Sequence, residues 1–174
     1  MREGCNLYTP EQRKRRDQSI WTPIQGVLAI AQFAVFLVSL ALVIRFLLSG
    51  HGEQAAALSI LVKTGVLLTI MVTGAIWERV VFGQYLFAPA FFWEDVVSFG
   101  VIALHVTYVI ALFSGWGSPT QQMIIALLAY TAYAVNAAQF VLKLRRARLE
   151  GVPAQSKASN ISGVAATEFV GAGQ

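Results

Sequence analysis

Long apolar runs alternate with short polar segments along this chain. The runs cover about residues 24–44, 55–76, 96–113 and 123–142. Runs of roughly 18 or more residues with few or no charges are long enough to cross a bilayer as helices. The pattern therefore predicts an all-α integral membrane protein, a four-helix bundle whose transmembrane domain spans about residues 21–148.

The segments outside the predicted bundle are polar. Residues 1–20 form a basic arm in which Thr9, Pro10 and Gln12 predict a short capped helix, because a Thr cap, a Pro at the first position and a Gln three residues on are typical of a helix start. Residues 149–174 lack a helical period, and we expect a disordered tail there. The first apolar run is too long for the core of a signal peptide, so we expect it to be retained as a helix.

The charges of the chain predict its orientation. The sequence is 56% hydrophobic and only 13% charged, whereas soluble domains are nearer a quarter charged. Most of its 13 Lys and Arg residues lie in the N-terminal arm, at Arg79 in the central loop, or after the fourth run. The positive-inside rule then places both termini and the central loop in the cytoplasm. The basic excess thus reflects membrane topology, and we expect no nucleic-acid partner.

Two ionisable side chains fall inside the apolar runs, where charge is costly and is a functional signal by default. Lys63 lies about 12 Å into the second run. It can pair with a substrate carboxylate or with an acid on another helix, or it can bond backbone carbonyls. His105 shares a helical face with Glu94, about 16 Å along the axis. The two can address separate parts of one large ligand, or His105 can simply join helices.

Polar residues also recur at heptad spacing on the first and fourth runs. These stripes are Gln25, Gln32 and Ser39, and Asn136, Gln139 and Lys143. Such stripes usually face neighbouring helices and join them. We therefore interpret both as helix packing.

Acids and aromatic rings are concentrated between the second and third runs. Glu78 and Arg79 end the second run, Glu94 and Asp95 begin the third, and a short loop between antiparallel helices brings these ends together. Carboxyl groups packed together beside apolar rings cannot all stay ionised at neutral pH, because repulsion and desolvation favour the protonated form. A carboxyl group that stays protonated there is a general acid. The alternative interpretation is an interfacial aromatic belt with solvated acids.

Four segments of this chain resemble a known family. They are LYTPEQR at residues 7–13, WTPIQG at 21–26, TGAIWE at 73–78 and VFGQYLFAPAFFWED at 81–95. They are similar to the 3-vinyl bacteriochlorophyllide hydratases, small integral membrane enzymes of bacteriochlorophyll biosynthesis in phototrophic bacteria. The resemblance covers about residues 7–145.

The resemblance implies a reaction and its partners. Water is added across the ring A vinyl group of chlorophyllide a or a 3-vinyl bacteriochlorophyllide, and a 1-hydroxyethyl group results. The macrocycle brings its own magnesium and a free propionate. No redox step is involved, so we expect no protein cofactor, in agreement with the lack of nucleotide-binding glycine loops and with the single cysteine, Cys5. We expect a bacterial inner membrane, cytoplasmic or intracytoplasmic. The sequence leaves open whether other pigment-biosynthesis enzymes dock on the basic termini.

For the chemistry, we expect a protonated carboxyl group to protonate the terminal vinyl carbon. A second carboxylate or a histidine then orients water toward the adjacent cationic carbon. Asp95 and Glu94 are the first candidates for acid and base, followed by Glu78. His105 either holds the water or ligates the magnesium of the substrate.

For binding, we expect Arg79 or Lys63 to pair with the propionate. The rings expected to contact the macrocycle are Trp77, Tyr85, Phe91, Phe92 and Trp93.

From the residues alone, two other classes of protein stay open. A non-catalytic pigment-binding or assembly protein would not need clustered acids. A transporter subunit would have acids near the midplane and an internal inverted repeat.

Overall fold

The computed structural model describes residues 7–150, with side chains described through Arg145. This range contains no strand. Its helices are α1 (Pro10–Gln18), α2 (Trp21–Ser49), α3 (Glu53–Phe82), α4 (Phe92–Ser114) and α5 (Pro119–Glu150). Residues Leu7–Phe140 form one compact unit that contains α1 to α4 and most of α5, and the last turns of α5, from Val141, belong to a second unit. Residues 149 and 150, which the sequence assigned to the tail, continue α5. Cys5 and the rest of the predicted tail lie outside the described residues.

The predicted all-α membrane bundle is confirmed. In the described part of the chain, four helices are long and apolar enough to cross a membrane: α2, α3, α4 and residues Pro119–Arg145 of α5. Each helix is longer than the apolar run that predicted it, because polar residues that flank the run also belong to the helix. Gly50, Gly83 and Gly115 each end a helix in the left-handed conformation, which glycine adopts without a side-chain penalty.

The predicted start of the short N-terminal helix is also confirmed. The Thr9 hydroxyl accepts the Gln12 backbone N–H at 3.2 Å, and the Gln12 side chain accepts the Thr9 backbone N–H at 2.9 Å. With Pro10 at the first position, this is a complete capping box. Local sequence alone therefore fixes where α1 begins.

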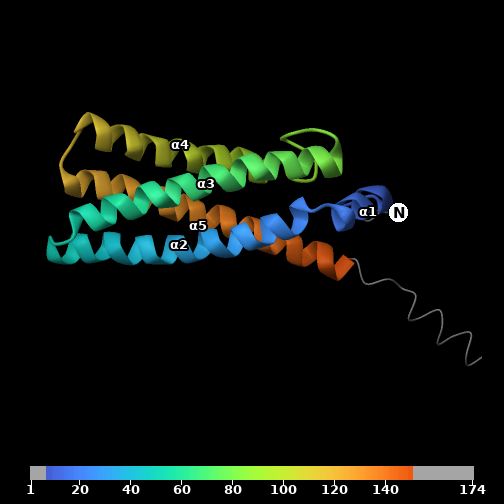
Figure 1. Cartoon of the computed structure of the whole chain (residues 1–174), viewed down its shortest axis with the longest axis horizontal. Coiled ribbons are helices and arrows are strands. Elements are labelled where there is room, and N and C mark those ends of the chain that lie inside the picture. Colours follow the sequence, from blue (N-terminus) through green and yellow to red (C-terminus); the bar gives the residue numbers. More distant parts are fainter. Residues whose placement is uncertain (1–6, 151–174) are drawn as a thin grey trace, which may run out of the picture. The chain divides into compact units, whose positions relative to one another are not determined.

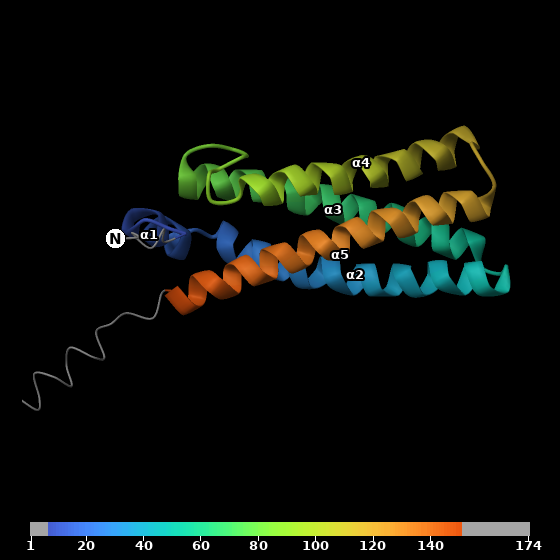
Figure 2. The same cartoon turned by 180° about the vertical axis from the view of Figure 1, so that it is seen from behind.

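Consecutive long helices run antiparallel in the unit Leu7–Phe140 (Figures 1 and 2). The α2–α3 and α4–α5 connections lie at one end, and the loop of residues 83–91 lies with α1 at the opposite end. The loop and α1 therefore share one side of the bundle, as the basic residues predicted. That this side faces the cytoplasm stays a prediction.

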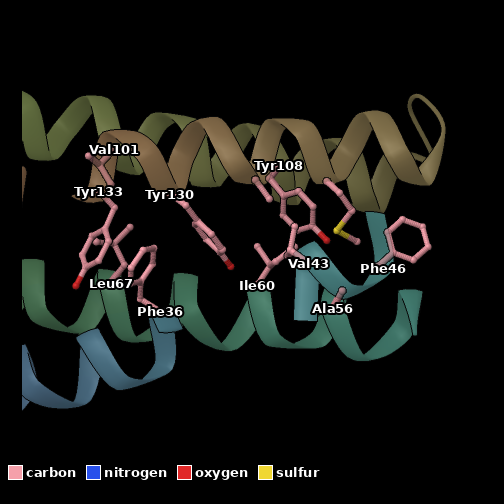
Figure 3. Packing of buried hydrophobic residues seen from close by; sticks show 12 residues of the cluster. Phe36, Val43, Phe46, Ala56, Ile60, Leu67, Val101, Tyr108, Tyr130 and Tyr133 are labelled. Atoms are coloured by element: carbon pink, nitrogen blue, oxygen red, sulfur yellow. The ribbon is translucent and has the colours of Figure 1, made fainter. Parts of the chain in front are cut away.

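The core between the helices is a mixture of apolar side chains and tyrosines (Figure 3). The Phe36 ring lies 5.5 Å from the Tyr130 ring and 5.0 Å from the Tyr133 ring. The stripe on α2 points inward as expected, since the Ser39 hydroxyl bonds the hydroxyls of both Ser59 and Tyr130. Helix packing through polar contacts therefore accounts for part of that stripe.

The stripe on α5 is only partly inward-facing. Asn136 is buried and donates to Ser98 at 2.8 Å, whereas Gln139 is exposed. Three residues rotate a helix by about 300°, so Gln139 lies about 60° away from the direction of Asn136. The expectation that the whole stripe packs against helices is wrong at Gln139.

Candidate active site at the ends of α3 and α4

Two carboxyl groups meet where α3 ends and α4 begins. Glu78 lies in the last turns of α3 and Asp95 in the first turn of α4, and their side chains are within hydrogen-bonding reach of each other. They are only 5% and 4% exposed. The antiparallel packing of α3 and α4 thus buries two acids against each other, which neither helix would do alone.

Two backbone hydrogen bonds hold the loop of residues 83–91 over this pair. The Phe87 backbone N–H donates to Asp95 Oδ2 at 2.7 Å, and the Ala88 backbone N–H donates to Glu78 Oε2 at 3.2 Å. Phe87 has a φ of 59°, in the left-handed region that costs a non-glycine residue roughly 1–3 kcal/mol. The two carboxyl groups therefore hold successive amides of a strained turn directly over themselves.

An aromatic cluster lies beside the pair. Its members are Tyr8, Trp77, Phe82, Phe91 and Phe140. The Phe91 ring lies 5.7 Å from the Trp77 ring and 6.0 Å from the Phe140 ring, and Phe91 is 2% exposed. The Trp77 indole N–H donates to the Thr22 hydroxyl at 3.0 Å. Trp77 and Phe91, which the sequence predicted to contact the macrocycle, therefore form part of the apolar wall of the site.

Sequence reasoning missed Tyr8 as a site residue. The arm carrying α1 lays the Tyr8 ring against Phe82 at 5.8 Å, and the Arg16 guanidinium lies 4.9 Å from the Tyr8 ring centroid. Burial raises the pKa of the Tyr8 phenol, so its hydroxyl stays neutral. The available signal was the family segment at residues 7–13, which carries this tyrosine.

Other rings of the same stretch lie on the surface and form an aromatic face. It consists of Tyr85, Phe87, Phe92 and Trp93. Tyr85 is 61% and Trp93 is 72% exposed. Exposed Arg79 lies beside Tyr85, with its guanidinium 5.6 Å from the Tyr85 ring centroid and donating to the Gly83 carbonyl. The Phe87 and Phe92 rings lie 5.7 Å apart and the Phe92 and Trp93 rings 5.5 Å apart, so a flat ligand can meet several exposed rings.

Glu94 and Asp95 are neighbours in sequence but not equivalent in space. Both lie in the first turn of α4 and both are largely buried. Successive residues of a helix point about 100° apart. Asp95 therefore points toward Glu78 and the loop, and Glu94 points in a different direction.

Lys63 and His105 lie elsewhere, in the middle of the bundle. Both are fully buried, the Lys63 Nζ sits 3.6 Å from the Tyr133 ring centroid, and the His105 ring lies 5.8 Å from the Tyr130 ring. The ten residues from Asp95 to His105 span about 15 Å along α4. The structure therefore gathers Glu78, Asp95, the loop and the aromatic cluster, and it places Lys63 and His105 in a separate group.

Comparison with known proteins gives a consistent result. A sequence model described as 2-vinyl bacteriochlorophyllide hydratase matches residues 8–146. A protein of that name from Rhodobacter capsulatus is 64% identical over 144 residues, which cover 83% of this chain and 84% of the relative. Another of that name, from Cereibacter sphaeroides, is 63% identical over 149 residues, covering 86% of this chain and 92% of the relative. No solved structure matches the chain.

Proposed function

The chain belongs to the 2-vinyl bacteriochlorophyllide hydratase family, and we propose that Glu78 and Asp95 carry out its reaction. It is an enzyme of bacteriochlorophyll biosynthesis and a multi-pass membrane protein. As a hydratase, it adds water to the vinyl group and yields a 1-hydroxyethyl group. This vinyl group carries the number 2 in the relatives' names and the number 3 in the alternative numbering of the macrocycle.

The observation that carries the proposal is the contact between two buried carboxyl groups. Two carboxylates this close in a poorly solvated site cannot both be ionised, so the pair holds one proton. Asp95 lies at the positive N-terminal end of α4 and accepts the shorter amide bond, 2.7 Å, both of which favour its carboxylate form. Glu78 lies near the negative C-terminal end of α3, which disfavours a charge there. Glu78 is therefore the proton donor and Asp95 the base.

This ranking differs from the one made from sequence, which put Asp95 and Glu94 first. Glu78 gives its proton to the terminal vinyl carbon, and positive charge develops on the adjacent carbon and spreads into the macrocycle. Asp95 orients a water molecule toward that carbon and takes its proton as the C–O bond forms. The proton then returns to Glu78 across the contact between the two carboxyl groups, so the pair is restored after each turnover. Such acid–base help contributes roughly 10²–10⁴-fold.

The substrate binds on the aromatic face, with its propionate on Arg79. Exposed Tyr85, Phe92 and Trp93 stack on the macrocycle, while Trp77 and Phe91 form an apolar wall beside the carboxyl pair. Both carboxyl groups lie under the loop, so the vinyl group reaches them when the Phe87 amide leaves Asp95. The reaction needs no cofactor from the protein, because the magnesium arrives in the macrocycle. We place the enzyme in the bacterial inner membrane with this end in the cytoplasm.

The proposal is tested with membranes that contain the full chain and are supplied with chlorophyllide a. The product is heavier by one water and absorbs at shorter wavelength in the red, because the vinyl group leaves the conjugated system. Glu78→Gln and Asp95→Asn each lose about 100-fold or more in rate, the lower range of acid–base catalysis. Glu53→Gln, which changes an exposed acid at the opposite end of α3, keeps the normal rate. Near-normal rates in both carboxyl variants would refute the proposal.

A further inference from the structure

A column of buried polar side chains runs through the bundle from the turn after Asp95 to the level of His105. Its members are Gln32 on α2, Lys63 on α3, Ser98 and His105 on α4, and Asn136 on α5. None is more than 9% exposed. Each of the four long helices contributes at least one of these side chains. We call the set the interior polar column.

Five side-chain atoms of the column make no hydrogen bond to any described residue. They are Nε2 and Oε1 of Gln32, Nζ of Lys63, Nε2 of His105 and Oδ1 of Asn136. Each buried polar atom left in this condition costs roughly 1–3 kcal/mol. Such atoms are normally satisfied by bound water, which typically makes about three hydrogen bonds to groups of this kind.

The hydrogen-bond donor or acceptor character of these atoms shows which ligand fits them. The His105 Nδ1 is bonded to the Val101 carbonyl at 2.8 Å, so Nδ1 carries the proton and Nε2 is an acceptor. Asn136 Oδ1 is an acceptor as well, whereas Lys63 Nζ is a donor, and Gln32 offers one of each. A metal cation does not suit the ammonium group, and an anion does not suit the acceptors. Water both donates and accepts, so it suits all of them.

The helix register makes the column continuous. Tyr130, Tyr133 and Asn136 follow one another at helical spacing on α5, and they contact His105, Lys63 and Ser98 respectively. Ser98 lies one turn after Asp95 on the same helix, where residues three apart share a face. On α2, Gln25 bonds Thr73 and Ser39 bonds Ser59, and these two contacts align α2 with α3. Gln32 lies midway between Gln25 and Ser39. It is therefore level with the turn of α3 that follows Lys63.

We propose that the interior polar column holds a file of water molecules that supplies the reaction's water to Asp95. This supply role rests on the proposed function of the carboxyl pair. Each turnover consumes one water, whose proton and hydroxyl end on neighbouring carbons. The aqueous side of the pair is covered by the loop of residues 83–91 and then by the macrocycle, and the outer helix faces meet lipid. Water stored behind the pair reaches the cationic carbon without passing the bound pigment.

The water itself is tested without any turnover, by X-ray radiolytic oxidation of the full chain in lipid nanodiscs. This method oxidises side chains that touch bound water, even when they are buried. Tyr133 and Phe46 are both 7% exposed, but only Tyr133 borders the column. We expect Tyr133 to be oxidised about tenfold more than Phe46 once corrected for intrinsic reactivity, and Asn136→Leu to remove most of the difference. Equal oxidation of the two rings would overturn the proposal.

The supply role is tested by steady-state kinetics. Gln32→Leu and Asn136→Leu lower kcat about tenfold and leave the KM for the pigment unchanged. These substitutions raise the activation free energy of the reaction but do not change the free energy of pigment binding. The matched control is Gln25→Leu, one heptad earlier on α2, whose amide already bonds Thr73 at 2.7 Å. Unchanged kcat in both column variants would overturn the supply role. So would a raised pigment KM in Lys63→Met with normal kcat, which would make the column a site for the propionate.

The two proposals fail separately. If Glu78→Gln and Asp95→Asn keep their activity while Tyr133 is still oxidised, the carboxyl mechanism is wrong and the water file stands. If those variants are inactive and Tyr133 resists oxidation, the carboxyl pair stands and the water file is wrong.

Discussion

The side chains of Glu78 and Asp95 lie within hydrogen-bonding reach of each other, although they belong to different helices. They also hold the amides of two successive loop residues, Phe87 and Ala88. One contact therefore joins the last turns of α3, the first turn of α4 and the loop between them. The same groups that are proposed to move protons also hold the loop over the site.

This double role separates two substitutions at Asp95. Asp95→Asn keeps a side-chain oxygen for the Phe87 amide, whereas Asp95→Ala removes it and leaves that amide unsatisfied at a cost of roughly 1–3 kcal/mol. Both variants lose activity, but only Asp95→Ala opens the loop. Hydrogen exchange at residues 86–88 measures this, and equal protection in the two variants would show that Asp95 does not hold the loop.

The aromatic cluster and the aromatic face respond differently to truncation. Phe91→Ala removes a buried ring and lowers the free energy of unfolding by about 3–5 kcal/mol. Trp93→Ala removes an exposed ring, leaves the thermal midpoint nearly unchanged and raises the KM for the pigment. Thermal denaturation in detergent and initial rates separate the two. A normal KM in Trp93→Ala would remove Trp93 from the binding surface.

Arg79 is expected to bind the propionate by a charged hydrogen bond. Arg79→Ala raises the KM for the pigment by a factor of about 10 to 150, since such a bond contributes roughly 1.5–3 kcal/mol. The methyl ester of the pigment, which lacks the negative charge, raises the wild-type KM to the same degree and is insensitive to the substitution. Arg45→Ala, which changes an exposed arginine near the other end of the bundle, serves as the control. Additive effects of the ester and of Arg79→Ala would show that the two groups do not meet.

The orientation of the bundle is tested by labelling introduced cysteines. Cys5 is the only cysteine of the chain, so Cys5→Ser gives a clean background. A membrane-impermeant maleimide reaches Gln84→Cys only from the cytoplasmic side and Ser118→Cys only from the other side, because the loop that carries Gln84 and the α4–α5 connection lie at opposite ends. Reversed labelling would place the carboxyl pair outside the cytoplasm and contradict the positive-inside prediction.

The sequence predicts most of the fold because its signals are local. The start of α1 follows from Thr9, Pro10 and Gln12, and the four long helices follow from apolar runs. The meeting of Glu78 with the start of α4 follows from antiparallel neighbours joined by a short loop. These features depend on residues close together in the chain.

Much of the site could not be predicted because it depends on how helices rotate against one another. Glu94 and Asp95 differ by about 100° around α4, and hydropathy does not say which of them turns toward α3. Likewise, Phe91 and Trp93 are equivalent aromatic residues in the sequence, yet Phe91 is buried in the aromatic cluster and Trp93, two residues later, is exposed. The grouping of Lys63 with Tyr133 requires the register of α3 against α5, which no local pattern encodes.

The most direct test of the central claim is an infrared measurement of the protonated carboxyl group in the pigment-free protein at neutral pH. A single proton held by Glu78 predicts a carboxylic acid C=O band that shifts in D2O, disappears in Glu78→Gln and persists in Asp95→Asn. If the wild-type protein lacks this band, or if Glu78→Gln retains it unchanged, Glu78 is not the proton donor and the mechanism built on the pair is wrong.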